Sequence, residues 1–363
     1  MSDIVEMEQN TVARPTGTPV GAAPAKRPWQ SVEWSRFVLV GVFVVVFVLF
    51  ASLLGEEFTS STNIANMLSS QAPLVVVVMA LMCPLISNEL DLSVAANAGL
   101  SQMLVGILTE QDHLGVGVMV IAVLGTGAAI GAINGALALS GLDVIIVTLG
   151  MSTILTGVEY WVSQDNVVAN LPNSLEQYVL NVRFLGVPME FYYALAVCAA
   201  MWWLVEHTPF GLRLLFVGRS MDVARYVGIK VNPIRFVSLV IAGVLASGAG
   251  ILYAGNIGSS NPSAGPELLL PAFACSFLGA TCFRMGRINP RGAIVAVYLL
   301  VMLSTGAQML GAPSYVEDLV YGIALIVALM LTRLSLKHFA RLATKGPFGW
   351  LRRSNTQEPA VGQ

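Results

Sequence analysis

The chain has 363 residues, of which 56% are hydrophobic and only 11% carry a formal charge. Charged residues make up about a quarter of an ordinary soluble domain, so this composition excludes that class and indicates an integral membrane protein. The formal net charge of -2 gives no support for a nucleic-acid-binding protein. The four cysteines lie singly in or beside apolar runs, without metal-ligand spacing, and we expect them to be small buried side chains.

The first 34 residues contain four prolines and no apolar run. Such a segment buries too little apolar surface to fold, so residues 1–34 are expected to form a disordered cytoplasmic tail. The first apolar run begins at Phe37 and has membrane-spanning length, whereas the apolar part of a signal peptide is shorter. We therefore interpret it as an uncleaved span.

The chain has ten apolar runs, this one included, and they predict an all-α, polytopic transmembrane helical bundle. A crossing helix needs about 20 residues, so the shorter runs must borrow flanking residues or be covered by neighbours, and the count lies between eight and ten, with ten preferred. The transmembrane domain is expected to cover residues 35–335, followed by a basic cytoplasmic tail at 336–363. The runs are 37–54, 72–87, 93–109, 116–139, 144–163, 191–205, 236–254, 268–281, 292–311 and 316–332.

The positions of the basic residues support ten spans with both termini in the cytoplasm. Lys and Arg concentrate on the cytoplasmic side of membrane proteins. In the ten-span arrangement, 18 of the 19 basic residues lie on one side and only Arg183 lies on the other. The largest inner loop between spans is then 206–235.

Small residues recur at every fourth position in two of the runs and predict close packing between helices. One set is Gly127, Gly131 and Gly135, and the other is Ala242, Ala246, Gly250 and Ala254.

Enzymatic function finds no support in the sequence. No GxxxxGK[ST] phosphate-binding loop occurs, so we expect no nucleotide hydrolysis by this chain. The three histidines are scattered and form neither a metal motif nor a catalytic triad. Polar groups at membrane depth instead usually line a pathway or bond across helices.

The densest polar segment lies between two apolar runs and contains Asn88, Glu89, Asp91 and Ser93. One interpretation places this segment on a water-filled pathway, because carboxylates beside a membrane are costly without water or a partner. The alternative is a solvated loop in which Asp91 caps the next helix. Asn134, Thr148 and Asn256 are further pathway candidates, although each one alone more often bonds across helices.

A second segment, residues 218–229, is predicted to form a short helix bounded by glycines in the inner loop. Val223, Tyr226 and Val227 fall on one face by helical spacing, while Asp222 and Arg225 face elsewhere. An apolar stripe of this kind docks against something. It packs either on the membrane domain, on lipid headgroups or on a partner protein.

At these residues the chain resembles the permease subunits of bacterial ATP-binding-cassette (ABC) importers of the ribose type. Each motif is weak alone, but their shared order over residues 63–333 is specific. The matching segments are LDLSV at 90–94, IGAING at 130–135, VTLGMS at 147–152 with Gly157, TPFG at 208–211, VG at 217–218, ARYVGI at 224–229, the Gly243 to Ala254 helix, and SSNPSAG at 259–265. Two departures stand out: Asn88 and Glu89 replace paired glycines, and the Gly-rich turn at 278–287 loses glycines and gains arginines.

The resemblance implies a multi-pass protein of the bacterial inner membrane that imports a small neutral solute, expected to be a monosaccharide or polyol. It implies a homodimer or paired permease in the lipid bilayer, a periplasmic solute-binding protein, and a cytoplasmic ATPase subunit that binds ATP and Mg²⁺, so no cofactor is expected on this chain. The implied ATPase-coupling residues are Gly218, Asp222, Val223, Ala224, Arg225, Tyr226, Val227 and Gly228. A self-sufficient secondary transporter is the alternative, although no clear internal repeat is found, and a membrane-embedded enzyme is a more distant one.

Overall fold

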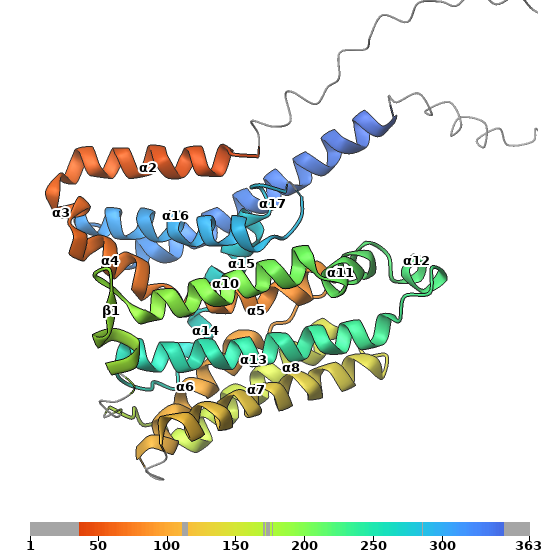
Figure 1. The fold of residues 1–363 in the computed structure, drawn as a ribbon, viewed down its shortest axis with the longest axis horizontal. Coiled ribbons are helices and arrows are strands. Elements are labelled where there is room, and N and C mark those ends of the chain that lie inside the picture. The colour runs from red at the N-terminus through yellow and green to blue at the C-terminus, as the bar shows by residue number, and fades with distance from the viewer. Residues whose placement is uncertain are drawn as a thin grey trace, which may run out of the picture.

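The computed structural model describes residues 36–110, 115–169, 171, 175, 177–284 and 286–344, and it is almost entirely helical (Figure 1). All ten predicted apolar runs lie in helices. The longer helices are α2 (Val38–Leu54), α4 (Ser61–Ser70), α5 (Ala72–Ile86), α6 (Val94–Glu110), α7 (Val116–Leu139), α8 (Val144–Ser163), α10 (Met189–His207), α11 (Pro209–Arg219), α13 (Val231–Ile257), α15 (Leu269–Gly279), α16 (Pro290–Met309) and α17 (Tyr315–Thr344). The short elements are α3 (Glu56–Thr59), η1 (Gln177–Asn181), α12 (Met221–Tyr226), α14 (Ala264–Glu267) and an antiparallel pair of strands, β1 (Arg183–Phe184) and β2 (Val187–Pro188).

Five helical segments are long and apolar enough to cross a membrane, namely Ser61–Ile86, Val116–Leu139, Val144–Ser163, Val231–Ile257 and Pro290–Met309. Three shorter helical segments are also apolar: Val38–Leu54, Val94–Thr109 and Ala264–Gly279. These helices define an all-α membrane bundle, and the count of ten spans stays a prediction. Figure 1 shows α2 beginning and α17 ending at the end of the molecule that carries α12, with β1 at the opposite end.

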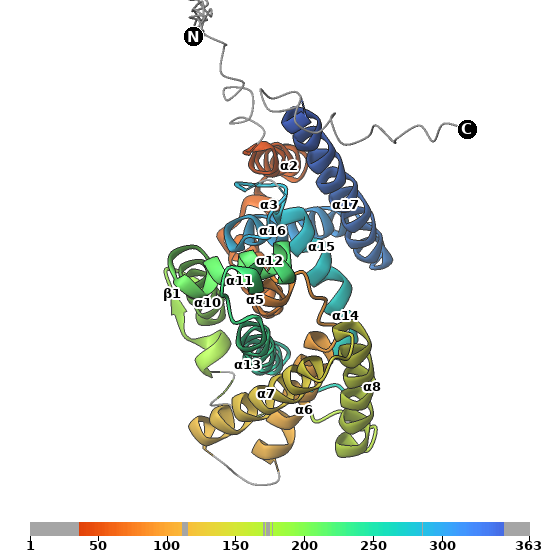
Figure 2. The same cartoon turned by 90° about the vertical axis from the view of Figure 1, so that its right-hand side faces the viewer.

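Helices α5 and α13 form the centre of the bundle. Every residue of α5 is apolar and all except Leu85 are buried, because helices surround it on all sides. Helix α13 packs against α5, α6 and α7, and Figure 2 shows it between α5 and α7 when the α12 end faces the viewer. The cysteines are all free and buried, as predicted.

The contact between α7 and α13 confirms the predicted role of the small residues. A side chain at Gly127 would meet Ser247 and the carbonyl oxygen of Gly243, and one at Gly131 would meet the backbone of Leu239. The two backbones therefore approach more closely than larger residues would permit.

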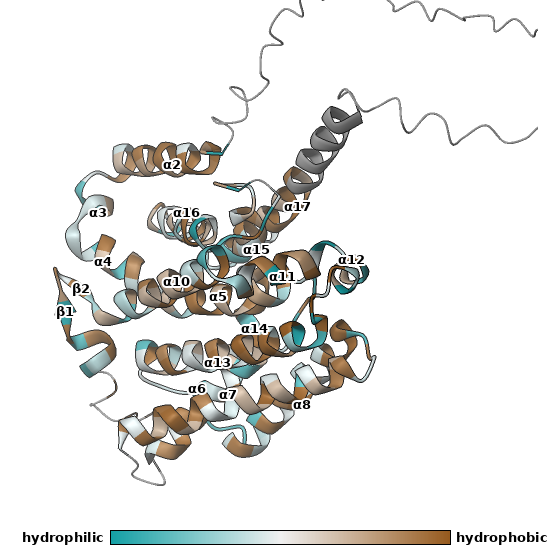
Figure 3. Cartoon of the chain, turned by 45° about the vertical axis from the view of Figure 1, so that its right-hand side comes forward, coloured by the Kyte–Doolittle hydropathy of each residue, from teal (hydrophilic) through white to brown (hydrophobic). Residues whose placement is uncertain are grey.

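The outer helices expose apolar side chains, as a lipid-facing surface requires. Large apolar residues are exposed along α2, α7 and α8, including Val45, Ile121, Ile146 and Trp161. Figure 3 shows hydrophobic colour along α2 and hydrophilic colour at α12.

The structure corrects one predicted element. The segment at 218–229 is not one helix, because Gly218 and Arg219 end α11, Ser220 caps the next helix, and α12 stops at Tyr226. Helix α17 continues to Thr344 and so includes residues 336–344 of the predicted tail, whose cytoplasmic position stays a prediction. The predicted tail segments 1–34 and 345–363 lie outside the described residues.

Candidate functional site

The linker between α5 and α6 is built by a helix end and a left-handed residue. Pro84 lacks an amide hydrogen, which weakens the helix near its end, and the Ser87 hydroxyl donates to its carbonyl at 2.8 Å. Asn88 then adopts a φ of 62°. Asparagine tolerates this region better than most residues with a side chain. The replacement of a glycine by Asn88 is thus compatible with a sharp turn.

A cavity of about 840 Å³ opens beside this linker. Asn88 and Glu89 lie on its wall together with Asp143, which precedes α8, and Arg235 of α13. Met221 of α12 also lines it, so the cavity lies toward the α12 end of the bundle. The remaining lining residues are Leu85, Leu90, Leu142, Val144, Ile145, Phe277, Ala280, Gly286, Ile288 and Leu329.

Glu89 and Arg235 form an ion pair in the wall of this cavity. The Glu89 side chain is 4% exposed and the Arg235 side chain 14%. The Ser87 hydroxyl oxygen, whose hydrogen points to the nearer Pro84 carbonyl, lies 3.4 Å from the other carboxylate oxygen. Removing one partner of such a buried pair leaves an uncompensated charge, which costs about 3–5 kcal/mol. The pair therefore fastens the linker to the start of α13.

Four of the predicted pathway residues lie behind this wall in a buried polar network. Asp91 Oδ1 accepts hydrogen bonds from the amide and the hydroxyl of Ser93, at 2.9 and 2.6 Å. The Asn134 amide donates to the Ser93 hydroxyl at 2.8 Å. Thr148 Oγ1 accepts from the Leu92 amide at 3.1 Å. These contacts hold the linker against α7 and α8, and Asp91 is buried rather than part of a solvated loop.

Asn256 is not brought together with the other candidates. Its side-chain amide donates to both carboxylate oxygens of Glu190 at 2.8 Å, which joins the end of α13 to the start of α10. It does not line the cavity that holds Asn88 and Glu89, and its place on a pathway stays a prediction.

Helix α12 presents its predicted apolar face to the outside. Tyr226 is 90% exposed, Val227 65% and Val223 56%, whereas Ala224 is buried and anchors the helix. Asp222 and Arg225 form an exposed ion pair at 3.6 Å on the same helix.

The conformation at the ends of α12 depends on two glycines. Gly228 has a φ of 82°, which L residues rarely adopt. Gly218 lies against the backbone of Ile86 and Ser87, where a side chain has no room. Both glycines predicted to bound the segment 218–229 are therefore required, Gly228 by its backbone conformation and Gly218 by its close packing.

Sequence reasoning missed Arg235, the cationic partner of Glu89 in the cavity wall. The predicted span began at residue 236, but α13 begins at Val231 and so includes Arg235. Its spacing of 146 residues from Glu89 left no local pattern to detect. A signal did exist, because a carboxylate beside a membrane needs a counter-charge.

The bundle of apolar helices has a cavity near one end, with a few charged and amide side chains in a largely apolar wall, and the exposed helix α12 lies at the same end. The family model described as "Branched-chain amino acid transport system / permease component" matches residues 63–329, and the chain belongs to this family. It is a multi-pass inner-membrane protein.

Curated relatives include three transport permeases. The D-allose transport system permease protein AlsC of Escherichia coli K12 is 27% identical over 86% of this chain and 96% of its own length. The ribose import permease protein RbsC of Bacillus subtilis 168 is 29% identical over 81% and 91%. The autoinducer 2 import system permease protein LsrD of Salmonella typhimurium LT2 is 24% identical over 84% and 92%. No solved structure matches the chain.

Proposed function

We propose that this chain is the permease subunit of an ABC importer that carries a small neutral solute, a monosaccharide or polyol, and is driven by a separate ATPase subunit. The observation that carries the proposal is the match to permeases of D-allose and ribose systems over most of both chains. The sequence has no phosphate-binding loop of its own, which fits an ATPase on another chain.

The charges around the cavity favour a neutral solute. Glu89 and Arg235 neutralise one another, and Asp143 accepts a hydrogen bond from the Ile145 amide at 2.8 Å, as the cap of α8. Asp143 has no ion-pair partner among the described residues, and the positive end of the α8 dipole partly offsets its charge. Asn88 is exposed on its wall and offers an amide to the hydroxyl groups of a sugar.

Helix α12, which we call the docking helix, is connected by a short segment to α13, the helix that carries Arg235 in the cavity wall. Helix α12 ends at Tyr226, α13 begins at Val231, and Arg235 lies just inside α13. A displacement of α12 by the ATPase moves the start of α13, and the Glu89–Arg235 pair passes that movement to the linker. Packed elements with two arrangements transmit movement in this way.

The remaining partners follow from the two ends and the outer face of the bundle. A periplasmic binding protein meets the end that carries β1, opposite α12. A second copy of the permease has room beside α8, because Gly150 and Gly157 have no neighbour within reach of an added side chain. Helices approach closely at glycines of this kind.

The docking helix provides the test of ATPase coupling. Tyr226→Ala should abolish co-purification with the partner ATPase subunit and lower ATP-driven uptake at least tenfold, while the permease remains folded. Arg213→Ala is the matched control, because Arg213 is exposed on α11 but lies outside α12. Unchanged co-purification and uptake in Tyr226→Ala would reject α12 as the coupling element.

Uptake by the permease alone separates the proposal from the main alternative. A secondary transporter needs no ATPase and responds to an ion gradient. Solute uptake into vesicles that contain only this chain would favour that class.

A further inference from the structure

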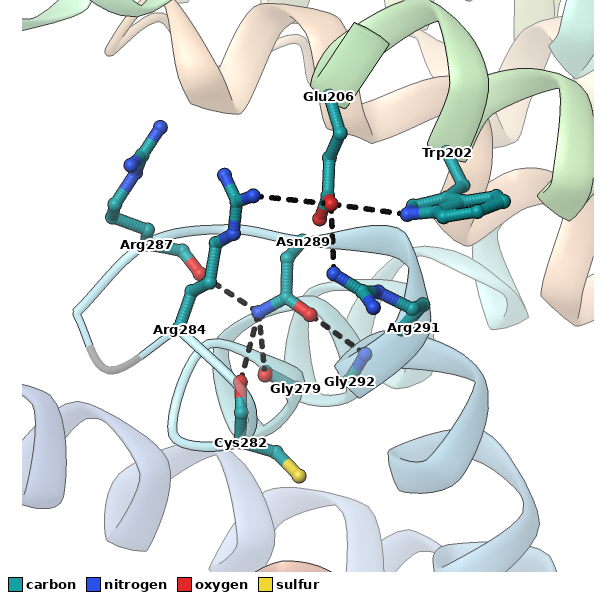
Figure 4. Close-up of polar contacts among 9 residues, drawn as sticks. All are labelled: Trp202, Glu206, Gly279, Cys282, Arg284, Arg287, Asn289, Arg291 and Gly292. Atoms are coloured by element: carbon teal, nitrogen blue, oxygen red, sulfur yellow. Dashed lines mark hydrogen bonds and ion pairs between the residues drawn. The ribbon is translucent and has the colours of Figure 1, made fainter. Parts of the chain in front are cut away.

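Several arginines surround one buried carboxylate where α10 ends beside the turn between α15 and α16 (Figure 4). The Glu206 side chain is 4% exposed. Its Oε2 atom accepts hydrogen bonds from Arg284 at 3.1 Å, Arg291 at 2.7 Å and the Trp202 indole at 3.0 Å. Arg291 also lies over the Trp202 ring, 5.4 Å from its centroid. The carboxylate is thus engaged through Oε2 alone, while its Oε1 atom is buried without a hydrogen-bond partner among the described residues.

Asn289 makes the turn that carries these arginines rigid. Its side-chain nitrogen lies 3.2, 3.0 and 3.0 Å from the carbonyl oxygens of Gly279, Cys282 and Arg287, which share its two hydrogens. Its Oδ1 atom accepts from the Gly292 amide at 2.8 Å, which caps α16. The backbone at Arg287 is therefore held in place, and its side chain extends away from Asn289 in Figure 4.

The cluster has more positive charge than its acid can balance. Arg284 and Arg291 share the single carboxylate of Glu206. In the part of the chain that the structure describes, no carboxylate forms an ion pair with Arg287 or Arg219. Burial lowers the pKa of Arg287, and the neighbouring charges of Arg284 and Arg219 lower it further against the opposing effect of Glu206. The unpaired positive charges of Arg287 and Arg219 therefore favour the binding of an anion.

The neighbouring surface is apolar and membrane-like. Phe37 and Val38 at the start of α2 are exposed, and Phe37 packs edge-on against Phe283 of the turn with centroids 5.9 Å apart. Trp203 of α10 is also exposed. Tryptophan concentrates at the level of lipid headgroups. Exposed apolar side chains beside the cluster are more stable in contact with lipid acyl chains than in water.

We propose that this arginine cluster binds the phosphate of an anionic phospholipid from the leaflet on the α12 side. Basic pockets between membrane helices on the cytoplasmic side bind such headgroups, and the guanidinium fork matches phosphate oxygens. Arg287 and Arg219 supply the unpaired charge, while Arg284 and Arg291 are held by Glu206. The turn is also where the sequence carries arginines in place of glycines. The site requires only membrane insertion and is independent of the transported solute.

Native mass spectrometry of the full-length permease, titrated with phosphatidylglycerol or phosphatidylcholine, tests the proposal. Phosphatidylglycerol should be retained in preference to phosphatidylcholine. Each arginine near a membrane surface contributes about fivefold to anionic lipid binding, so Arg287→Gln should lower retention about fivefold and the Arg219→Gln, Arg287→Gln double variant further. Arg287 forms no ion pair in the described residues, so its loss should leave folding intact.

Control variants define the results that would overturn the proposal. Arg287→Lys keeps the charge and should retain most of the lipid, and Arg213→Gln removes an exposed arginine outside the cluster and should retain all of it. Equal losses in Arg287→Gln and Arg213→Gln would show diffuse surface charge instead of a site. Displacement of the lipid by millimolar inorganic phosphate would assign the cluster to a soluble anion. Loss of ATPase binding in Arg287→Gln, with lipid retention unchanged, would assign it to the protein partner.

Discussion

Glu89 and Asp91 are two residues apart but have different surroundings, so their neutral variants should differ. Glu89→Gln leaves Arg235 without its counter-charge in the cavity wall, and we expect uptake to fall about tenfold or more. Asp91→Asn keeps a carbonyl oxygen that can accept from the Ser93 amide, and its effect should be mild.

Uptake assays on both single variants and on the double variant measure this difference. The charge-reversed double variant Glu89→Arg, Arg235→Glu should recover part of the lost uptake, because it restores the pair. Wild-type uptake in the Glu89→Gln, Asp91→Asn double variant would show that neither carboxylate acts in transport.

Thr148 is expected to stabilise the linker rather than touch solute. Thr148→Val removes the acceptor of the Leu92 amide, and leaving that donor unpaired should lower the free energy of unfolding by about 1–3 kcal/mol. Thr153→Val is the matched control on the same helix, since the exposed Thr153 hydroxyl only donates to Leu149 at 3.1 Å. Thermal unfolding of the purified variants compares them, and equal melting temperatures would contradict the role of the network.

At the scale of elements, the close crossing of α7 and α13 depends on glycine, which has no side chain to separate the two helices. Gly127→Ala adds a methyl group that meets Ser247 and the Gly243 carbonyl, and such overpacking costs about 1–3 kcal/mol. Gly125→Ala adds the same group on the same helix where nothing lies nearby, and the better helix propensity of alanine should leave stability equal or higher.

The fraction of each glycine variant that remains monodisperse after heating measures this prediction. Gly127→Ala should aggregate at a lower temperature than the wild type and Gly125→Ala should not. The reverse order would show that α7 and α13 do not pack as described.

Helix positions could be predicted from sequence because an apolar run of near-spanning length has few alternatives in a membrane. The helices of the inner loop 206–235 were harder to predict. Residues 209–219 carry two arginines and no long apolar run, so the helix α11 was not expected, although Thr208 caps it and Pro209 suits its first turn. The start of α13 at Val231 was not predicted for the same reason. Residues 231–235 precede the apolar run and include polar side chains.

At the scale of the whole molecule, the sidedness of the basic residues indicated an inner face, and the structure places α11 and α12 at the end where α2 begins (Figure 1). The candidate site was predicted only in part. Asn88 and Glu89 were identified because local sequence shows polar groups between apolar runs. Arg235 and the Glu206 cluster were not, because they join elements that are distant in sequence.

ATP-driven uptake in a reconstituted system tests the central claim most directly. Vesicles would contain this permease and its proposed partners, the ATPase subunit and the binding protein. A radiolabelled monosaccharide that the binding protein retains would be outside, and ATP would be on the ATPase side. We predict uptake that requires all three proteins and hydrolysable ATP, and that is lost in Tyr226→Ala. Uptake by the permease alone, driven by a proton or sodium gradient and indifferent to ATP, would contradict the account.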